Sequence, residues 1–487
     1  MLVAGLVLPP AGLVLLWMRP AGLVRKILGS LVIAGIGVAH LFLFYGLRAE
    51  FDGTGIVPLF SFYKPESHYA ALERSRTAPV ALPEPAPARE VATPAGASSR
   101  PTPAAYWTDF RGPRRDGRYD EMEILTDWPA KGLARLWKLP VGGGYASFVV
   151  AEGKAFTIEQ RRDREVVAAY DVETGRELWT HSWPANFQES MGGDGPRATP
   201  TWHEGKLYAL GAEGELRCLQ AQTGKLVWSK NILTDNGATN INWGMAAAPL
   251  IVDEKVIVLP GGSLGKSVVA YHKQTGEPIW RALDDKQAYT SPMLVTLAGK
   301  RQILVVSARR ALGLTVENGT LLWEYPWTTQ YDINVAQPIV VGENRFFISA
   351  GYGHGAALVE VAPTGARAVW QNTRMKNKFT SSVLHQGHLY GLDEAILACV
   401  NVDTGDLKWK GGRYGYGQVA LAGGHLGVLT EEGEVALVKA TPEGHREVAK
   451  FSALDGKTWN PPAIAGGLLL VRNTTEMACF RLGKPFR

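Results

Sequence analysis

The chain has 487 residues, of which 46% are hydrophobic and 20% charged, so it can build a large folded core. Its formal net charge is only +5 at pH 7. The densest basic stretch, RGPRRDGR at residues 111–118, is interrupted by Asp116 and has no aromatic residues among its arginines. Nucleic-acid binding is therefore not expected, because it needs a continuous basic surface.

The first 50 residues are predicted to form a membrane anchor with one or two transmembrane helices. Residues 27–47, ILGSLVIAGIGVAHLFLFYGL, are apolar and long enough to cross a bilayer. Residues 1–18 are also apolar, but Pro9 and Pro10 would kink or break a helix there, which leaves open whether this run spans. A cleaved signal peptide is the alternative, although no small-residue cleavage site follows the second run.

Basic residues between the two apolar runs set the expected orientation. They are Arg19, Arg25 and Lys26. By the positive-inside rule this short loop is cytoplasmic, so everything after Leu47 lies on the periplasmic side of the cytoplasmic (inner) membrane.

Residues 51–105 are predicted to be a juxtamembrane segment and a linker. Residues 75–105 are rich in Pro, Ala and Ser and have almost no large apolar side chains, so they cannot bury enough surface to fold. We interpret them as an extended spacer that holds the next domain away from the bilayer. The preceding residues 57–76 are interpreted as a short interfacial piece.

One phrase recurs in the remainder of the chain, residues 106–487. It reads AYDVETGRELW at 169–179 and returns as LQAQTGKLVW (219–228), AYHKQTGEPIW (270–280) and VNVDTGDLKW (400–409). Each copy has a short apolar run, a Thr-Gly corner and a tryptophan four residues after the glycine. This pattern is typical of a strand, a tight turn and a second strand, because glycine adopts positive φ and residues such as Asp171 and Thr174 bond the turn amides.

Weaker copies extend the phrase into a series spaced by about 40 to 50 residues, the size of a four-stranded propeller blade. The series is Trp137, Trp179, Trp228, Trp280, Trp323, Trp370, Trp409 and Phe451. It predicts an all-β, eight-bladed β-propeller in which the tryptophans have a structural docking role. The last unit lacks one strand, so residues 134–141 are predicted to form its outer strand and close the ring.

The pattern A-x-D-x-x-T-G-x-x-x-W, complete in residues 169–179, resembles the tryptophan-docking repeat of quinoprotein-type propellers. WTDFRGPRRDG (107–117) and GDGPRATPT (193–201) further resemble bacterial pyrroloquinoline-quinone-like propeller repeat proteins. That group is similar to the propeller lipoprotein of the outer-membrane β-barrel assembly machine. The resemblance implies a fold and very little chemistry.

The cysteines occupy the slot that Ala169 holds in the first full phrase. They are Cys218, Cys399 and Cys479. We expect small, buried residues in non-neighbouring blades, too far apart for a disulfide. No Cys-x-x-Cys, His-Glu-x-x-His or P-loop motif is present, and neither is the adjacent Cys-Cys pair of quinoprotein dehydrogenases. No metal site is predicted.

Candidate binding residues come from the segments that enter the innermost strands, which gather at one mouth of a propeller channel. They are Tyr145, Asp194, Arg197, Asn242, Trp243, Tyr289, Asp332, Asn334, Lys378, Gln418, Trp459 and Asn460. The alternative is that these polar residues only satisfy backbone groups along a water-filled channel.

Two functions are consistent with these features. The first is an anchored, extracytoplasmic binding or scaffold module for a protein or other envelope ligand, without a cofactor or catalysis of its own. The second is an alcohol or sugar dehydrogenase that uses pyrroloquinoline quinone and calcium. Asp332 or Asp194 would then be the general base, and Asp332 with Asn334 would begin a calcium site. The missing cysteine pair favours the first function.

Overall fold

A computed structural model of the chain describes residues 9–18, 20, 22–44, 47–51, 58–62, 66–77 and 106–483. It divides into two compact units. The first contains Met1–Ala70 with Gln188–Gly193, and the second contains Ala71–Phe187 with Asp194–Arg487.

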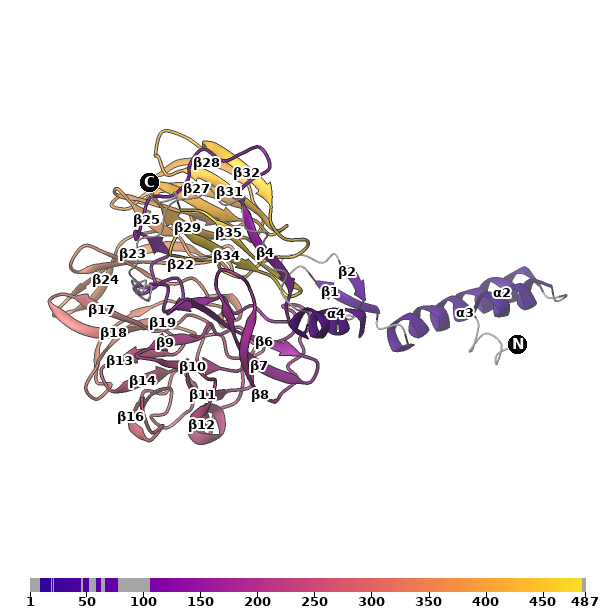
Figure 1. The fold of residues 1–487 in the computed structure, drawn as a ribbon, viewed down its shortest axis with the longest axis horizontal. Helices are drawn as coiled ribbons and strands as arrows, with labels where there is room; N and C mark the ends of the chain where they lie inside the picture. Colours follow the sequence, from indigo (N-terminus) through magenta and orange to yellow (C-terminus); the bar gives the residue numbers. More distant parts are fainter. Residues whose placement is uncertain are drawn as a thin grey trace, which may run out of the picture. The chain divides into compact units, whose positions relative to one another are not determined.

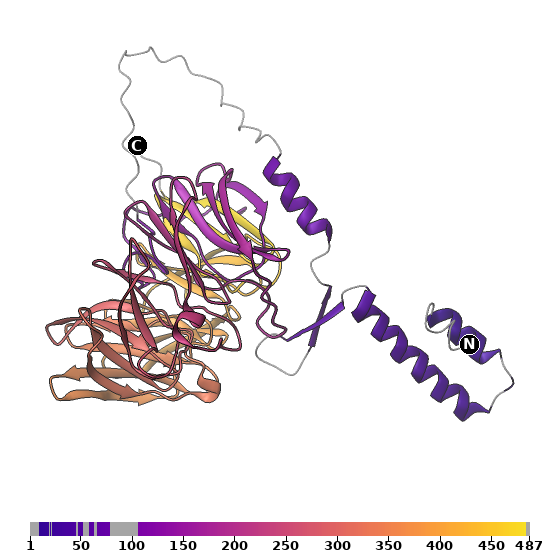
Figure 2. The same cartoon turned by 90° about the horizontal axis from the view of Figure 1, so that it is seen from below.

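The described part of the first unit contains a helical pair and a β-hairpin. Helix α2 (Pro9–Trp17) is followed by α3 (Leu23–Phe44), and β1 (Leu47–Phe51) pairs antiparallel with β2 (Pro58–Phe62) (Figure 2). Pro9 and Pro10 open α2 instead of kinking it, because the first turn of a helix tolerates proline. Helix α3 covers Leu23–Phe44, so both of its ends lie a few residues earlier in the chain than those of the predicted span, 27–47. The hairpin begins at Leu47, inside the predicted anchor of residues 1–50.

Helix α2 packs on α3 through small and aromatic residues. A Cβ on Gly29 would lie 2.7 Å from Leu16 Cδ2, and the Trp17 indole donates a 3.0 Å hydrogen bond to Ser30 Oγ. Of the helices in the described residues, α3 is the one long and apolar enough to cross a membrane, over Leu23–Leu41.

The second unit contains eight antiparallel sheets arranged as propeller blades, which confirms the predicted fold (Figure 1). The first four blades are β5 (Val149–Ala151), β6 (Lys154–Arg161), β7 (Arg164–Asp171) and β8 (Glu177–Pro184); β9 (Thr201–His203), β10 (Lys206–Leu210), β11 (Glu215–Gln220) and β12 (Leu226–Asn231); β13 (Leu250–Val252), β14 (Lys255–Val258), β15 (Val268–His272) and β16 (Pro278–Ala282); and β17 (Met293–Leu297), β18 (Lys300–Val306), β19 (Arg310–Thr315) and β20 (Leu321–Pro326).

Blades five to seven are β21 (Ile339–Val341), β22 (Arg345–Ala350), β23 (Gly355–Ala362) and β24 (Gly365–Asn372); β25 (Val383–His385), β26 (His388–Asp393), β27 (Ile396–Asn401) and β28 (Leu407–Arg413); and β29 (Gln418–Ala422), β30 (His425–Leu429), β31 (Glu434–Lys439) and β32 (Glu447–Ser452). The short strand β3 (Arg118–Tyr119) adds to the inner edge of blade seven, where it runs parallel to β29.

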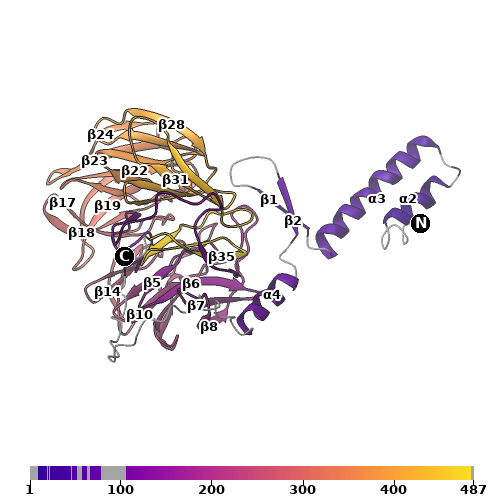
Figure 3. The same ribbon diagram turned by 45° about the horizontal axis from the view of Figure 1, so that its top comes forward.

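The eighth blade closes the ring with strands from both ends of the domain. It consists of β33 (Ala463–Ala465), β34 (Leu468–Arg472), β35 (Glu476–Arg481) and β4 (Arg135–Pro140). β4 pairs antiparallel with β35 as its outer strand, so the prediction for residues 134–141 is confirmed. In Figure 3 the yellow β35 lies beside blade one.

The docking tryptophans connect each blade to the next. The indole nitrogen of Trp179 donates to the carbonyl of Ala221 at 3.0 Å, and the indoles of Trp137, Trp228, Trp280, Trp370 and Trp409 bond the next blade in the same way. A turn glycine of the next blade lies against the rings of Trp137, Trp179, Trp228, Trp280 and Trp370. A Cβ on Gly276, for example, would lie 2.8 Å from the Trp228 ring. The glycine therefore provides both the positive φ of the turn and the space for the indole.

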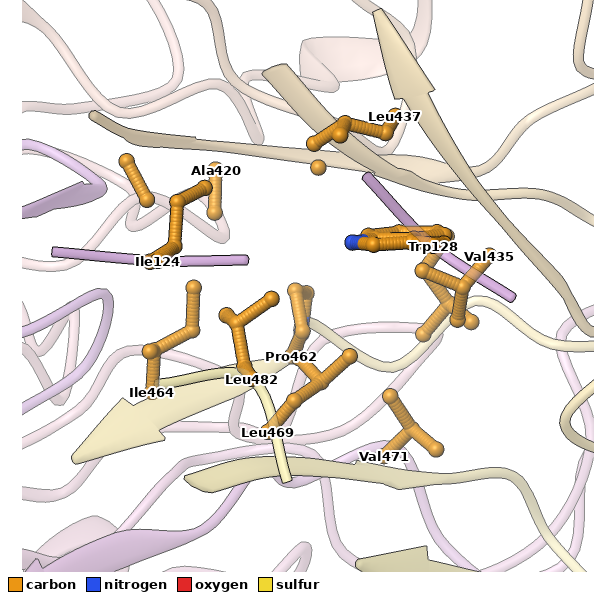
Figure 4. Close-up of a pocket in the computed structure, with 13 residues that line it drawn as sticks. Ile124, Trp128, Ala420, Val435, Leu437, Pro462, Ile464, Leu469, Val471 and Leu482 are labelled. Atoms are coloured by element: carbon orange, nitrogen blue, oxygen red, sulfur yellow. The ribbon is translucent and has the colours of Figure 1, made fainter. Parts of the chain in front are cut away.

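Two blades depart from this arrangement. Trp323 donates instead to Gln302 Oε1 of its own blade at 2.5 Å, because Gly313 opposite leaves space for that amide. Blade seven has Phe451, and Trp128 from the segment before β4 packs on it edge to face at 5.6 Å. Figure 4 shows Trp128 beside the small pocket between blades seven and eight. Because hydrocarbon lines this pocket, it offers a ligand no orienting polar groups.

The cysteine slot is a register position directly opposite the docking tryptophan. Ala169 pairs with Trp179, Cys218 with Trp228, Cys399 with Trp409, and Cys479 with Trp137. The cysteines are buried and unbridged, as predicted. A small side chain is favoured there because the indole covers the facing position.

Two short helical segments interrupt the predicted all-β domain. Helix α5 (Ile232–Asn236) follows β12, and the 3₁₀ turn η1 (Gln330–Asp332) lies between blades four and five. Asn231 caps α5 by accepting from the amides of Leu233 and Thr234, and Gly237 ends it in the left-handed conformation. These local signals were present in the sequence but are too short to give a helical period.

Candidate functional site

The segment before the ring-closing strand bonds backbone groups of several blades. We call residues 106–119 the plug. The carbonyl of Trp107 accepts from Val150 in blade one, and that of Thr108 accepts from Trp202 in blade two, both at 2.8 Å. With β3 paired to β29, the plug occupies inner-strand edges that would otherwise expose unpaired backbone groups.

Buried arginines of the plug bond further blades. Arg115 Nη1 donates to the carbonyls of Ala248 (3.2 Å) and Pro292 (2.5 Å), in blades three and four. Arg111 Nη2 donates to the carbonyl of Ser382 in blade six at 2.8 Å. Burial lowers the pKa of Arg111 to about 10, so it stays charged at neutral pH. Two arginines of the basic stretch noted in the sequence, Arg111 and Arg115, are thus buried, whereas Arg114 is exposed.

The segments that enter the inner strands carry a group of aromatic rings, which we call the collar. It consists of Tyr145, Phe187, Trp243, Tyr289, Tyr352, Phe379, Tyr416 and Trp459. Trp459 stacks on Tyr145 at 5.7 Å and contacts Phe379 at 4.8 Å. Trp243 and Tyr289 form a second contact at 5.7 Å. Most of these rings are half-buried, so they retain accessible faces.

Cations lie over several collar rings. Arg197 lies 4.9 Å from the Phe187 ring centre and 5.4 Å from that of Tyr145. Lys378, only 6% exposed, lies 4.4 Å from the Tyr352 ring centre and within 5.4 Å of two more. Lys457 covers Trp459 at 4.4 Å. Of the predicted residues, Arg197 and Tyr145 are therefore brought together, whereas the rings beside Lys378 were not among the predicted ones.

The predicted amides hold the collar loops in place. Gln418 Nε2 donates to the carbonyls of Phe379 and Trp459 at 2.9 and 2.7 Å. Asn460 Nδ2 donates to the carbonyls on both sides of Tyr145. Asn334 Nδ2 donates to the carbonyl of Ser307, and the backbone carbonyl of Asn334 accepts from the backbone amide of Tyr289. These side chains are buried and act on the loops through backbone groups.

A glutamate that was not singled out in the sequence also fixes the collar. Glu431 Oε1 accepts from the Trp459 indole at 2.9 Å, and Oε2 accepts from the Tyr416 amide at 3.1 Å. Phe379 and Tyr416 lie in the same entering segments as the predicted residues and could have been selected there. Phe187 lies in the long insertion after β8, whereas Tyr352 lies in the turn between β22 and β23, a different class of loop.

The remaining predicted polar residues are Asp332, Asn242 and Asp194. Asp332 lies on η1, where Oδ2 pairs with Lys286 Nζ at 2.9 Å. Asn242 is exposed beside Trp243, and Asp194 is half-buried in the loop before β9.

The calcium set suggested by the sequence does not fit these positions. The Asp332 carboxylate is bonded to a lysine, and the Asn334 side chain is buried with its amide nitrogen on the Ser307 carbonyl. Within the described residues, no group of at least three His, Cys, Asp or Glu side chains could hold a metal ion. Calcium sites generally need carboxylate oxygens that are free to coordinate.

Fold and repeat together define a pyrroloquinoline-quinone-like repeat propeller. The chain belongs to the family described as outer membrane protein assembly factor BamB, which matches residues 163–411. It is 23% identical over 369 residues to the outer membrane protein assembly factor BamB of Burkholderia pseudomallei, covering 66% of this chain and 92% of that protein.

In sequence, the dehydrogenase relatives match over a shorter length. The 1-butanol dehydrogenase (cytochrome c) of Thauera butanivorans is 28% identical over 151 residues, 30% of this chain and 21% of that protein. The crystal structure of quinohemoprotein alcohol dehydrogenase from Comamonas testosteroni superposes with a TM-score of 0.60 at 13% identity, covering 78% of this chain and 81% of that one. At this identity the superposition shows the fold alone.

Proposed function

We propose that this protein is an anchored, extracytoplasmic scaffold whose collar binds a segment of a protein partner in the cell envelope, without catalysis of its own. The collar carries the proposal, because it gathers half-buried rings and cations from several blades. Tyr, Trp and Arg dominate the binding energy of protein interfaces, since rigid aromatic side chains lose little entropy on binding. Membership of an assembly-factor family supports a partner of this kind.

The expected location rests on α3 and on the charges before it. Helix α3 is long and apolar enough to span, and Arg25 and Lys26 lie in its first turn. The positive-inside rule then assigns this end to the cytoplasm and the propeller to the periplasmic side of the inner membrane.

A quinone-dependent dehydrogenase is the second candidate, because dehydrogenases are among the sequence relatives. The residues of this chain support it poorly. The adjacent cysteine pair is missing from the sequence, and the carboxylate suggested for calcium is paired with Lys286. Absorbance titration of the purified chain with pyrroloquinoline quinone and calcium, followed by dye reduction with alcohols, tests it directly. Stoichiometric uptake with turnover would overturn the scaffold proposal.

The scaffold proposal is tested by site-specific photo-crosslinking in intact envelopes. A photoreactive phenylalanine analogue replaces Tyr289 or Phe187 in the collar. The control position is Gln386, an exposed turn residue at the opposite end of an innermost strand. One discrete adduct is expected from the collar positions and none from Gln386.

Specificity is checked by combining the crosslinker with Trp459→Ala, which removes a collar ring. The adduct should fall at least about tenfold, because truncating a buried aromatic anchor typically costs 2 kcal/mol or more. The purified partner, identified by mass spectrometry, should then bind the purified chain with the same dependence on Trp459. Equal crosslinking at Gln386, or no effect of Trp459→Ala, would contradict the proposal.

A further inference from the structure

The end of helix α4 (Glu66–Thr77) is bound to the propeller near the junction that closes the ring. Its residues Ala71–Thr77 belong to the propeller unit. Arg76, with a side chain only 8% exposed, donates from Nη2 to the Pro140 carbonyl at the end of β4, at 2.7 Å. Leu72, one turn earlier on the same face, is 1% exposed.

The Arg76 guanidinium also contacts blade one. Its Nε lies 3.4 Å from Glu177 Oε2, and its central carbon lies 4.9 Å from the Tyr170 ring centre. One turn before it, Glu73 accepts a 3.1 Å hydrogen bond from Arg162. The helix is therefore attached to both β4 and blade one.

Blade one receives Arg76 in a buried ionic cluster. Glu159 is fully buried, bonds Arg161, and accepts a 2.9 Å hydrogen bond from the Tyr170 hydroxyl. Arg161 bonds Glu177 as well. Burial alone would raise the pKa of Glu159, but the charges of Arg161, Arg76 and Arg472 outweigh it and lower the pKa to about 2.

The same cluster crosses the ring closure. Arg472 at the end of β34 in blade eight donates from Nη1 to Thr157 Oγ1 at 2.7 Å and to the Ile158 carbonyl at 3.1 Å, both in blade one. Arg76 adds a further cation to these paired charges from outside the ring. Such a desolvated, charge-assisted contact is geometrically specific, and removing one partner leaves buried charge behind.

We infer that α4 is a second, noncovalent attachment of the propeller to the N-terminal part of the chain. Since the attached helix precedes residues 78–105, that Pro/Ala-rich stretch connects two segments of the propeller unit. On this inference it does not separate the anchor from the propeller, as the sequence had suggested. If the chain is cut within residues 78–105, the α4 contact alone then keeps the propeller on the N-terminal part of the chain, whatever the collar binds.

The test cuts the chain between the two attachments. A recognition site for a sequence-specific protease replaces residues 92–98, and the full-length protein, purified in detergent, is immobilised through an N-terminal tag. After complete cleavage, with the immobilised protein at micromolar concentration, the propeller fragment should remain on the support. In Arg76→Ala the retained fraction should fall, with an apparent dissociation constant at least about tenfold weaker, as for loss of a buried charge-assisted bond. Arg74→Ala, an exposed arginine two residues earlier, is the charge-matched control and should behave like the parent.

Hydrogen exchange in the uncut chain gives a second measurement that does not need cleavage. Amides of residues 71–77 should be protected in the parent protein and in Arg74→Ala, and should exchange at least about tenfold faster in Arg76→Ala. Blade amides outside the ionic cluster should remain protected in all three, which shows that the propeller is folded. Release of the propeller from the cut parent protein would overturn the inference, as would equal retention and exchange in Arg76→Ala.

Discussion

Replacing Arg115 with methionine tests whether the plug holds the blades together. Arg115 is 2% exposed and bonds the carbonyls of Ala248, Pro249 and Pro292, together with Asp109 Oδ1 at 2.7 Å. Methionine keeps most of the apolar stem but removes every donor. The variant also leaves Asp109 buried with only neutral donors, the Phe110 amide and the Thr201 hydroxyl.

The expected loss in the free energy of unfolding is about 3–5 kcal/mol, the usual cost of breaking a buried ion pair from one side. In the double variant Arg115→Met with Asp109→Asn, the stranded charge is gone. The double variant should therefore lose less free energy of unfolding than the sum of the losses of the two single variants. The difference, which is the coupling energy, should be about 1–2 kcal/mol. Arg114→Met is the neighbouring control: its side chain is 53% exposed and pairs with Asp116 and Asp120, so its loss should stay near 0.5 kcal/mol or below.

Urea unfolding followed by tryptophan fluorescence and circular dichroism measures these losses. The pH dependence adds a second check. Burial raises the pKa of Asp109 above its ordinary value even with Arg115 present, so its ionisation costs more once that charge is removed. Arg115→Met should regain part of its stability relative to the parent as the pH falls, because its folded state binds the Asp109 proton more readily than its unfolded state does. A loss no larger than that of Arg114→Met, or strictly additive losses, would refute the reasoning.

Three further predictions concern the blades. Burial raises the pKa of Glu165 from 4.5 to about 7, so the folded state holds a proton that the unfolded state releases, and stability should fall as the pH rises from 4.5 to 7. Glu165→Gln should flatten that slope and gain roughly 3 kcal/mol at pH 8 in urea unfolding; parallel curves for the two proteins would contradict this. Gly276→Ala and Gly205→Ala both add a Cβ to a residue with φ of 73°, but only the Cβ at position 276 meets an indole ring. Gly276→Ala should therefore lose about 1–3 kcal/mol more free energy of unfolding than Gly205→Ala. Equal losses would rule out the docking role. Burial raises the thiol pKa of Cys218, Cys399 and Cys479 to about 12, 11 and 12, so none should react with a thiol reagent until the protein is unfolded in guanidinium, and rapid labelling of the folded protein would show that the slot is open.

The collar shows how far inference from the sequence reached. The segments entering the inner strands were identifiable from the repeat, so Tyr145, Tyr289 and Trp459 could be selected. Lys378 could be selected too, but its position among three rings could not be known. Tyr352 was missed because it comes from a different class of turn, and Glu431 because its role depends on residues of two other loops.

The sequence by itself determined the blades, their number, the docking tryptophans and the strand that closes the ring. These features follow from local patterns, namely a turn glycine, a small residue opposite an indole and a fixed strand count, which recur whatever the partners are. Only the tertiary structure decided that Arg111 and Arg115 are buried against carbonyls of distant blades and that Arg76 is attached near the ring closure. Both depend on carbonyls and carboxylates that come together from distant blades only when the ring closes, and no local pattern in the chain encodes that convergence.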